Sequence, residues 1–291
     1  MRKNNIICIF LIILSLGVLF AYSAWNNLSL DSVSPEIRFP DQVTQLSVTQ
    51  DRKQLLAGIT AVDKVDGDVT NSLVVEDIKI ADPEKGSAMI SVAAFDSSGN
   101  VAKAQTQVQY SDYHSPRFKL SRALIFQANL NVDVLDYISA DDCIDGDLTH
   151  NIRAVSISES SITDEGIHHV AFKVTNSLGD QAEIILPVET RAYSAGYGEL
   201  ILSDYLIYLQ KGDAFQPSDY LHSFKLNQET TSLEHGLPRN YTLETTGTVN
   251  TDKPGVYSVS YTVNYRIPSV NGSGSDQVIP AHSKLIVVVE G

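Results

Sequence analysis

Two hydrophobic patterns divide this chain into a short N-terminal part and a long remainder. Residues 6–21 form an apolar run without a charge. From residue 34 onward, apolar and polar residues alternate over short stretches that are separated by turn-forming residues. A period of two is typical of β-strands with one buried face, and no long helical periodicity follows the apolar run. The pattern therefore predicts one apolar helix followed by an all-β region.

The clearest predicted strands come in pairs that are joined by polar turns. Residues 89–96 and 101–110 flank the turn Ser97-Ser98-Gly99-Asn100, and residues 166–175 and 182–189 flank a turn at 176–180. Glycine in such turns permits the positive φ that tight hairpin loops require. A third pair, 254–265 and 284–289, encloses a longer Gly/Ser-rich tip at 271–276. These pairs predict three β-hairpins.

The apolar run predicts a membrane anchor. Together with the residues up to Trp25 it reaches about 20 residues, which is the length of a helix that spans a bilayer. Arg2 and Lys3 favour an N-terminus held inside, so residues 1–5 are expected to be cytoplasmic, 6–25 to be a transmembrane signal anchor and everything beyond to be extracellular. A cleaved signal peptide, with Ala21-Tyr22-Ser23 as the cleavage site, is the alternative. Both interpretations export the remainder of the chain.

An acidic signature occurs twice, about eighty residues apart. Residues 63–70 and 142–149 share the pattern Asp-x-x-Asp-Gly-Asp-(Val/Leu)-Thr, and each copy follows a Ser-Pro start, at Ser34-Pro35 and Ser115-Pro116. A repeat at this period indicates tandem domains, so we expect a linker at 26–33 and domains at 34–112, 113–191 and 192–291. The last domain keeps the strand pattern and lacks the signature. Short strands with frequent turns favour small β-sandwiches that are joined by short connectors.

Charge and cysteine content narrow the function further. The formal net charge is -14, and all 35 acidic residues lie beyond residue 30. This argues against nucleic acid as a partner, because binding phosphates needs a basic face. Cys8 and Cys143 cannot meet if Cys8 lies in the bilayer, so no disulfide framework is expected.

The acidic signature itself has two interpretations. Three aspartates around a glycine offer some of the six to eight oxygen ligands that calcium takes, although the spacing is not that of an EF-hand. Aspartates also shape turns by accepting hydrogen bonds from the backbone, and this structural interpretation is favoured. The candidate calcium ligands are Asp63, Asp66, Asp68, Asp142, Asp145 and Asp147. No other cofactor is expected.

The Ser-Pro start, the acidic signature and the closing strand together resemble a known family. They are similar to bacterial immunoglobulin-like surface domains of the DUF5011 type, which are also named for the Ig-like domain of a pesticidal crystal protein. The resemblance covers residues 34–112 and 115–190 and extends only in part to 199–291. It implies Ig-like β-sandwiches in tandem on an exported protein, with no catalytic activity.

These features favour a non-catalytic, membrane-anchored surface protein. Its modules would act as a spacer or as a scaffold for protein interaction or adhesion, with an extracellular protein as the partner. The alternative is a carbohydrate- or cell-wall-binding protein, in which the third domain reads the glycan and its tyrosines provide stacking platforms. Most of these tyrosines alternate along strands, as Tyr257, Tyr261 and Tyr265 do, which favours packing within the sheet.

Overall fold

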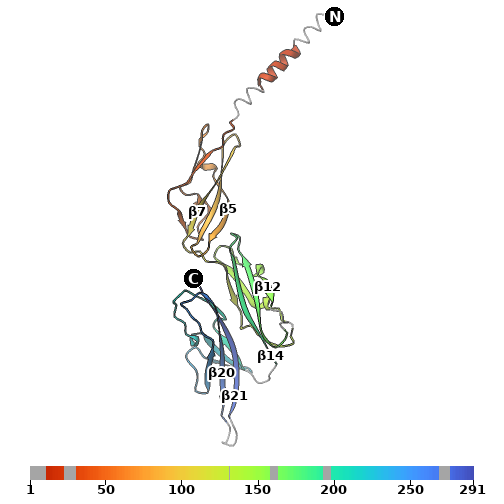
Figure 1. Cartoon of the computed structure of the whole chain (residues 1–291), viewed down its shortest axis with the longest axis vertical. Coiled ribbons are helices and arrows are strands. Elements are labelled where there is room, and N and C mark those ends of the chain that lie inside the picture. Colours follow the sequence, from red (N-terminus) through yellow and green to blue (C-terminus); the bar gives the residue numbers. More distant parts are fainter. Residues whose placement is uncertain (1–10, 23–30, 131, 158–162, 193–197, 269–275) are drawn as a thin grey trace. The chain divides into compact units, whose positions relative to one another are not determined.

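The computed structural model describes residues 11–22, 31–130, 132–157, 163–192, 198–268 and 276–291, and its β-strands dominate the chain (Figure 1). The chain divides into two compact units. One consists of Met1–Ala81 with Ser87–Ser111, and the other of Asp82–Gly86 with Asp112–Gly291. The expected all-β organisation in tandem sandwiches is confirmed.

The first unit contains one sandwich of a three-stranded and a four-stranded sheet. The smaller sheet has the order β1 (Glu36–Arg38), β3 (Thr60–Asp63), β4 (Gly67–Asp68). The larger has the order β2 (Thr44–Leu46), β7 (Val101–Tyr110), β6 (Ser87–Phe95), β5 (Val74–Asp82). Two 3-10 turns, η1 (Arg52–Leu56) and η2 (Thr70–Ser72), complete it.

The core of this sandwich follows the predicted period of two. Along β6, the side chains of Ala88, Ile90, Val92 and Ala94 are all fully buried, and the small side chain of Ala93 between them is buried as well. Successive strand residues point to opposite faces, so alternate apolar residues line one face against the other sheet. The predicted turn 97–100 joins β6 to β7, which pair as an antiparallel hairpin from Phe95–Val101 onward.

The second sandwich repeats this arrangement. Its smaller sheet has the order β8 (Arg117–Leu120), β10 (Ile138–Asp142), β11 (Gly146–Asp147). Its larger sheet has the order β9 (Ile125–Gln127), β14 (Gln181–Arg191), β13 (Gly166–Thr175), β12 (Arg153–Ile157), with 3-10 turns η3 (Val134–Tyr137) and η4 (Thr149–Asn151). The hairpin predicted around residues 176–180 is formed by β13 and β14.

The third sandwich has the same topology although it lacks the acidic signature. The smaller sheet has the order β15 (Glu199–Leu202), β17 (Leu221–Leu226), β18 (Glu229–Ser232). The larger has the order β16 (Leu206–Leu209), β21 (Gln277–Val289), β20 (Gly255–Ile267), β19 (Tyr241–Thr246), and η5 (Pro217–Tyr220) precedes β17. The predicted hairpin of the third domain is therefore β20 with β21. The predicted tip at 271–276 lies almost wholly outside the described residues.

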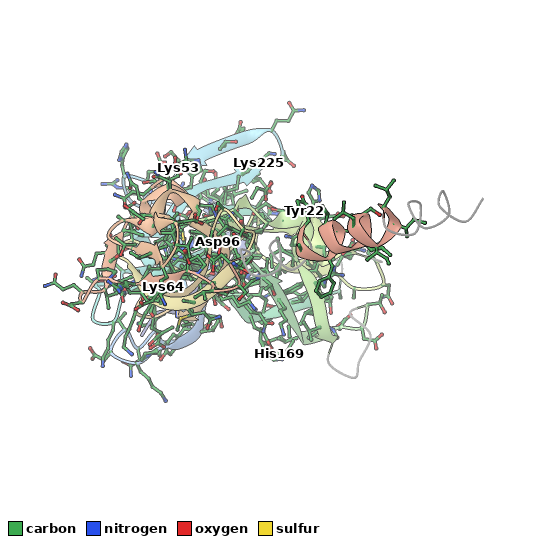
Figure 2. The ribbon with its side chains drawn as sticks, turned by 90° about the horizontal axis from the view of Figure 1, so that it is seen from above. Tyr22, Lys53, Lys64, Asp96, His169 and Lys225 are labelled. Atoms are coloured by element: carbon green, nitrogen blue, oxygen red, sulfur yellow. The ribbon has the colours of Figure 1, made fainter. Side chains whose placement is uncertain are left out.

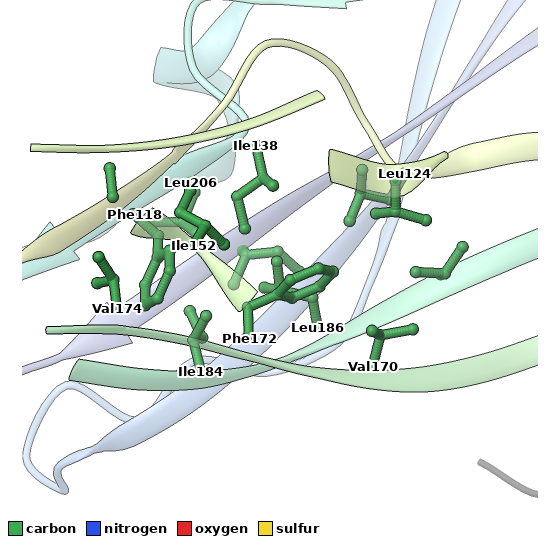
Figure 3. Packing of buried hydrophobic residues seen from close by; sticks show 14 of the residues in the cluster. Phe118, Leu124, Ile138, Ile152, Val170, Phe172, Val174, Ile184, Leu186 and Leu206 are labelled. Atoms are coloured by element: carbon green, nitrogen blue, oxygen red, sulfur yellow. The ribbon is translucent and has the colours of Figure 1, made fainter. Parts of the chain in front are cut away.

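The second and third sandwiches belong to one compact unit, because their apolar cores touch. Leu206 and Ile286 of the third sandwich are buried in the cluster that holds Phe118, Ile138 and Ile152 of the second. Figure 3 shows Leu206 among these side chains. Burial of one such aliphatic side chain contributes about 1.5–3 kcal/mol. This contact distinguishes the unit from domains that are joined only by a connector.

The predicted membrane anchor is described only in part. Residues 11–22 are helical, whereas residues 6–10 and 23–25 of the expected span lie outside the described residues. Side chains of this helix point outward around its circumference (Figure 2), and the apolar ones are exposed. Within the described part of the chain, no helix is both long and apolar enough to cross a membrane.

Candidate functional site

The two acidic signatures fold into the same turn. In the first, Oδ1 of Asp63 accepts hydrogen bonds from the amides of Val65 (2.6 Å) and Asp66 (2.9 Å). These bonds lower the pKa of Asp63, so its carboxylate is ionised at neutral pH. The turn ends at Gly67, whose φ of +77° favours glycine.

The second signature repeats these bonds closely. Oδ1 of Asp142 accepts from the amides of Ile144 (2.8 Å) and Asp145 (3.0 Å). Gly146 has a φ of +73° at the position that matches Gly67. The Asp-x-x-Asp-Gly part of the signature is therefore the sequence that this turn geometry requires.

The second aspartate of each signature holds the neighbouring hairpin. The carboxylate of Asp66 accepts from the backbone amide and the hydroxyl of Ser97, both at 2.8 Å. Asp145 accepts the same pair from Ser177, at 2.6 and 2.7 Å. A serine that opens the hairpin turn therefore connects the two sheets of the sandwich in both repeats.

The third aspartate of each signature organises the 3-10 turn that follows. Oδ1 of Asp68 accepts from the amide of Thr70, and Oδ1 of Asp147 accepts from that of Thr149, each at 2.9 Å. Hydrogen bonds from these threonines lower the pKa of both carboxylates. Each threonine hydroxyl in turn accepts a bond from the backbone of the strand before the turn, at Ala61 and at Ala140. These contacts support the structural interpretation of the signature.

A carboxylate cluster nevertheless forms at the same end of the first repeat. Asp31, Asp63 and Asp96 each place an oxygen atom within 4.8 Å of the other two. It is the only such group of three acidic, histidine or cysteine side chains in the part of the chain that the structure describes. Of the six predicted calcium ligands, only Asp63 belongs to it. Asp31 and Asp96 were not among the predicted residues.

The second repeat arranges the equivalent positions differently. Asn176 stands where the first repeat has Asp96, and its Nδ2 donates to Oδ2 of Asp142 (3.2 Å) and to the hydroxyl of Tyr113 (2.9 Å). The Tyr113 hydroxyl donates to Oδ2 of Asp180 at 2.7 Å. Burial raises the pKa of Tyr113, and the Asp180 carboxylate raises it further, so this hydroxyl stays protonated. Two neutral donors, the Asn176 amide and the Tyr113 hydroxyl, therefore satisfy the carboxylates at this end of the second repeat.

The second and third sandwiches are joined by a buried ionic group. Nζ of Lys284 lies 2.7 Å from Oε2 of Glu189, and both side chains are largely buried. Nε of Arg191 contacts the other carboxylate oxygen of Glu189. Burial alone would raise the pKa of Glu189, but the bonds from Lys284 and Arg191 bring it below its ordinary value. The ionised carboxylate of Glu189 is therefore the stable form within this unit.

A second group of polar contacts lies at Arg117. Its guanidinium forms two bonds to the carboxylate of Glu290, at 3.2 and 2.6 Å, and lies 5.1 Å from the ring centre of Tyr208. The Tyr208 hydroxyl accepts a bond from the amide of Phe118 at 2.8 Å. Burial raises the pKa of Tyr208 to about 12.

A cavity of about 320 Å³ opens where the second and third sandwiches meet, and residues of both line it. Its wall contains charged side chains, such as Arg122 and Glu199, and the rings of Phe126 and Tyr205. Small-molecule sites in proteins start at roughly this size, about 300 Å³. The cavity is therefore a second candidate for binding, in addition to the acidic end of the first repeat.

The tyrosines of the third domain serve mainly in packing. Tyr261 is fully buried, and Tyr257 and Tyr265 pack against the core of the third sandwich. Tyr241 and Tyr265 stack on each other with ring centres 4.7 Å apart. This agrees with the favoured interpretation of the alternating tyrosines.

Comparisons with known proteins bear on the fold alone. No family model matches the chain, and no curated protein matches it, so the expected membership of the DUF5011 type is not confirmed. Among solved structures, the chain is similar to the extracellular domain of protocadherin gammaB4 (8% identity, TM-score 0.21, covering 89% of this chain and 51% of that one). Mouse cadherin-23 EC22-24 is 12% identical at a TM-score of 0.21 and covers 88% of this chain and 99% of that one.

A bacterial structure is about equally similar. It contains CBM51-2 in complex with GlcNAc and INT domains of ZmpB from Clostridium perfringens, at 12% identity and a TM-score of 0.22. The alignment covers 88% of this chain and 42% of that one, so this chain spans less than half of its length, and about half of the protocadherin. These structures are tandem β-sandwich domains of the Ig-like or cadherin type. At such low scores they carry no argument about function, and the chain shares with them the tandem β-sandwich organisation.

Proposed function

We propose that this chain is a non-catalytic protein of the bacterial cell surface whose tandem sandwiches act as a scaffold for protein interaction or adhesion. The observation that carries the proposal is the junction within residues 112–291. Two sandwiches share an apolar core there and a buried Lys284–Glu189 pair. A unit of this kind presents two sandwiches in one defined arrangement, which suits a platform for a partner protein.

The membrane anchor is part of this proposal. Residues 6–25 have the length and composition of a spanning helix, and Arg2 with Lys3 favours a cytoplasmic N-terminus. The net charge of the remaining chain is compatible with a hydrated surface outside the cell. The N-terminal helix would hold the sandwiches at the membrane, with the partner outside.

Protease treatment of intact cells tests the topology. The full chain, carrying an epitope tag after Gly291, should lose the tag when protease is added outside and keep it in cells that are not treated. A tag that stays protected until the cells are lysed would contradict the exported orientation. A second tag before Met1 serves as the control and should be protected in intact cells.

Crosslinking on intact cells then tests the scaffold. Photoreactive residues at exposed positions of the two-sandwich unit, such as Val155 and Ile185, should capture a surface protein in a defined band. The matched control places the same residue at Val174, which is buried in the core of the second sandwich. Equal patterns from the exposed and buried positions would argue against a specific protein partner.

The glycan-binding alternative rests on the cavity beside the junction. Its combination of charged groups and the rings of Phe126 and Tyr205 suits a small polar ligand such as a sugar. Pull-down of the full chain on purified cell wall tests it, with Tyr205→Ala as the variant and Tyr257→Ala, which lies outside the cavity lining, as the control. Binding that survives both substitutions equally would remove the cavity as the glycan site.

A further inference from the structure

The carboxylate cluster of the first repeat brings together three segments that are distant in the sequence. Asp31 precedes β1, Asp63 ends β3, and Asp96 opens the turn between β6 and β7. Their oxygen atoms lie within 4.8 Å of one another. Three like charges at this separation repel, so the fold holds them together against an electrostatic cost.

Two of these carboxylates have an oxygen without a hydrogen-bond partner among the described residues. Asp63 is only 3% exposed, and while its Oδ1 accepts two turn amides, its Oδ2 is buried and accepts none. Oδ2 of Asp31 is buried and without a partner in the same way. Buried charged oxygens are almost always paired with donors or coordinate a metal.

The second repeat indicates where Oδ2 of Asp63 points. The equivalent oxygen, Oδ2 of Asp142, accepts a bond from Asn176, which stands at the position of Asp96. In the first repeat the amide donor is replaced by a carboxylate. An acceptor therefore faces an acceptor, and a positive group between them would satisfy both.

The separation of less than 4.8 Å leaves the three oxygen atoms close enough to share one calcium ion. Calcium binds oxygen at about 2.3–2.6 Å, so two ligands on opposite sides of one ion are separated by about 4.6–5.2 Å. Magnesium demands near-ideal octahedral geometry and usually keeps several waters, so a site built from three side-chain carboxylates favours calcium. Carboxylates in addition are the side chains that calcium prefers.

We propose that Asp31, Asp63 and Asp96 bind one calcium ion at the end of the first repeat, and that the second repeat uses the Asn176 amide in place of the ion. Backbone carbonyls and water complete the coordination. Asp63 was a predicted ligand, whereas the two residues that complete the group come from outside the Asp-Gly-Asp signature.

The surrounding hydrogen bonds give this site a structural consequence. Nδ2 of Asn100 donates to Oδ2 of Asp96 (2.6 Å) and to the backbone carbonyl of Asp31 (3.0 Å). The segment that enters the domain is thus already held against the β6–β7 turn. Calcium adds an ionic link between the same segments, so it is expected to fix the start of the sandwich.

Calcium binding by the purified full chain in detergent tests the proposal. Isothermal titration with calcium chloride should show one site per chain, and calcium should raise the melting temperature of the first unit relative to the same sample in chelator. The Asp31→Asn variant keeps an oxygen that can accept from the amide of Val33. It should lose at least tenfold in calcium affinity and show a smaller calcium-dependent shift in melting temperature.

The matched control is Asp112→Asn at the equivalent position of the second repeat, which should bind calcium like the wild type. Asp96→Asn is the second test variant, and its melting in chelator shows whether it is folded. No binding by the wild type at millimolar calcium would overturn the proposal. Equal affinity in the wild type and both test variants, or equal protection by magnesium, would overturn it as well.

Discussion

The first and second repeats share one turn and differ in the neighbouring hairpin, where an aspartate and an asparagine have exchanged places. In both, the aspartates of the signature accept the same turn amides and hold the same serine of the neighbouring hairpin. The two diverge where Asp96 and Asn100 of the first repeat correspond to Asn176 and Asp180 of the second. What is shared therefore explains the common turn and its link to the hairpin in both repeats. What differs leaves a carboxylate cluster in the first repeat and, in the second, a hydrogen-bond network that is complete without an ion.

The repeats differ also in what they pack against. The first forms a compact unit of its own, whereas the second shares a unit with the third sandwich. Leu206, Ile286 and Lys284 of the third sandwich supply the contacts that the second repeat needs. The same topology thus serves one repeat as a single module and the other as half of a pair.

The largest effect should come from breaking the buried ion pair of the second unit. Lys284→Ala leaves Glu189 without its main partner in a largely buried position, which should cost about 3–5 kcal/mol of unfolding free energy. Calorimetry or denaturant titration of the full chain should show this loss in the transition of the second unit, with that of the first unit unchanged.

The control for this prediction is Lys225→Ala in the same sandwich. Lys225 pairs with Glu199 at 3.7 Å, and both side chains are exposed, so the loss should be about 0–1 kcal/mol. If both variants lose the same free energy, the pair at Lys284 does not stabilise the junction.

The second-largest loss of unfolding free energy should come from replacing Asn176 of the second repeat by aspartate, the residue that the first repeat has there. Asn176→Asp removes the amide that donates to Asp142 and to Tyr113, and it adds a buried negative charge. We expect a loss of about 1–3 kcal/mol in the second unit, because buried acceptors lose their donor. Thermal and urea unfolding measure it.

The reciprocal variant sharpens that result. In chelator, Asp96→Asn gains an amide near Asp63 and loses one of the two acceptor oxygens that Asn100 uses. These changes oppose each other, so the unfolding free energy should change less than in Asn176→Asp. Equal losses in the two variants would mean that the repeats do not differ at this position as described.

A smaller and equal effect is expected at the threonine that both repeats share. Thr70→Val and Thr149→Val each remove a hydroxyl that accepts a bond from the preceding strand, at 3.1 and 3.3 Å. Each should cost about 1 kcal/mol in its own unit. Denaturant titration that resolves the two units is the measurement, and a loss confined to one repeat would contradict the shared role.

The smallest effect concerns acid, and here the Glu189 carboxylate of the second unit. The folded-state pKa of Glu189 lies below its ordinary value of 4.5, because Lys284 and Arg191 stabilise the ionised form. This contribution is complete above pH 4.5 and is lost as the pH falls through the folded-state pKa. Unfolding measured from pH 6 to pH 3 should show the loss, and Glu189→Gln should show less of it. If Glu189→Gln leaves the pH dependence of the unfolding free energy unchanged, other groups cause the acid sensitivity.

The strands and the repeat could be predicted from the sequence because they depend on local patterns. Alternation along residues 87–95 sets the buried face of β6, and glycine with serine marks the turn that follows. Even the third sandwich, which has lost the signature, keeps its alternating strands and with them the topology.

The junction and the full carboxylate cluster depend on distant contacts and could not be predicted in this way. Lys284 is a visible signal, since it is a charge within the otherwise apolar strand 284–289, but nothing local pairs it with Glu189. Asp31 and Asp96 lie in separate segments, and only the fold brings them to Asp63. Aligning the two repeats would have shown the exchange of Asp96 for Asn176, although not its meaning.

The parallel pairing of an edge strand with the last strand of its sandwich has a mechanical consequence. In the first repeat, β2 runs parallel to the last strand, β7, and in the second, β9 runs parallel to β14. Tension applied to the two ends of such a domain pulls these strands in opposite directions along their axes. Their hydrogen bonds are then loaded in shear and must break together, whereas an antiparallel terminal pair would open one bond at a time. A domain with this parallel pairing is expected to resist a force that pulls its two ends apart.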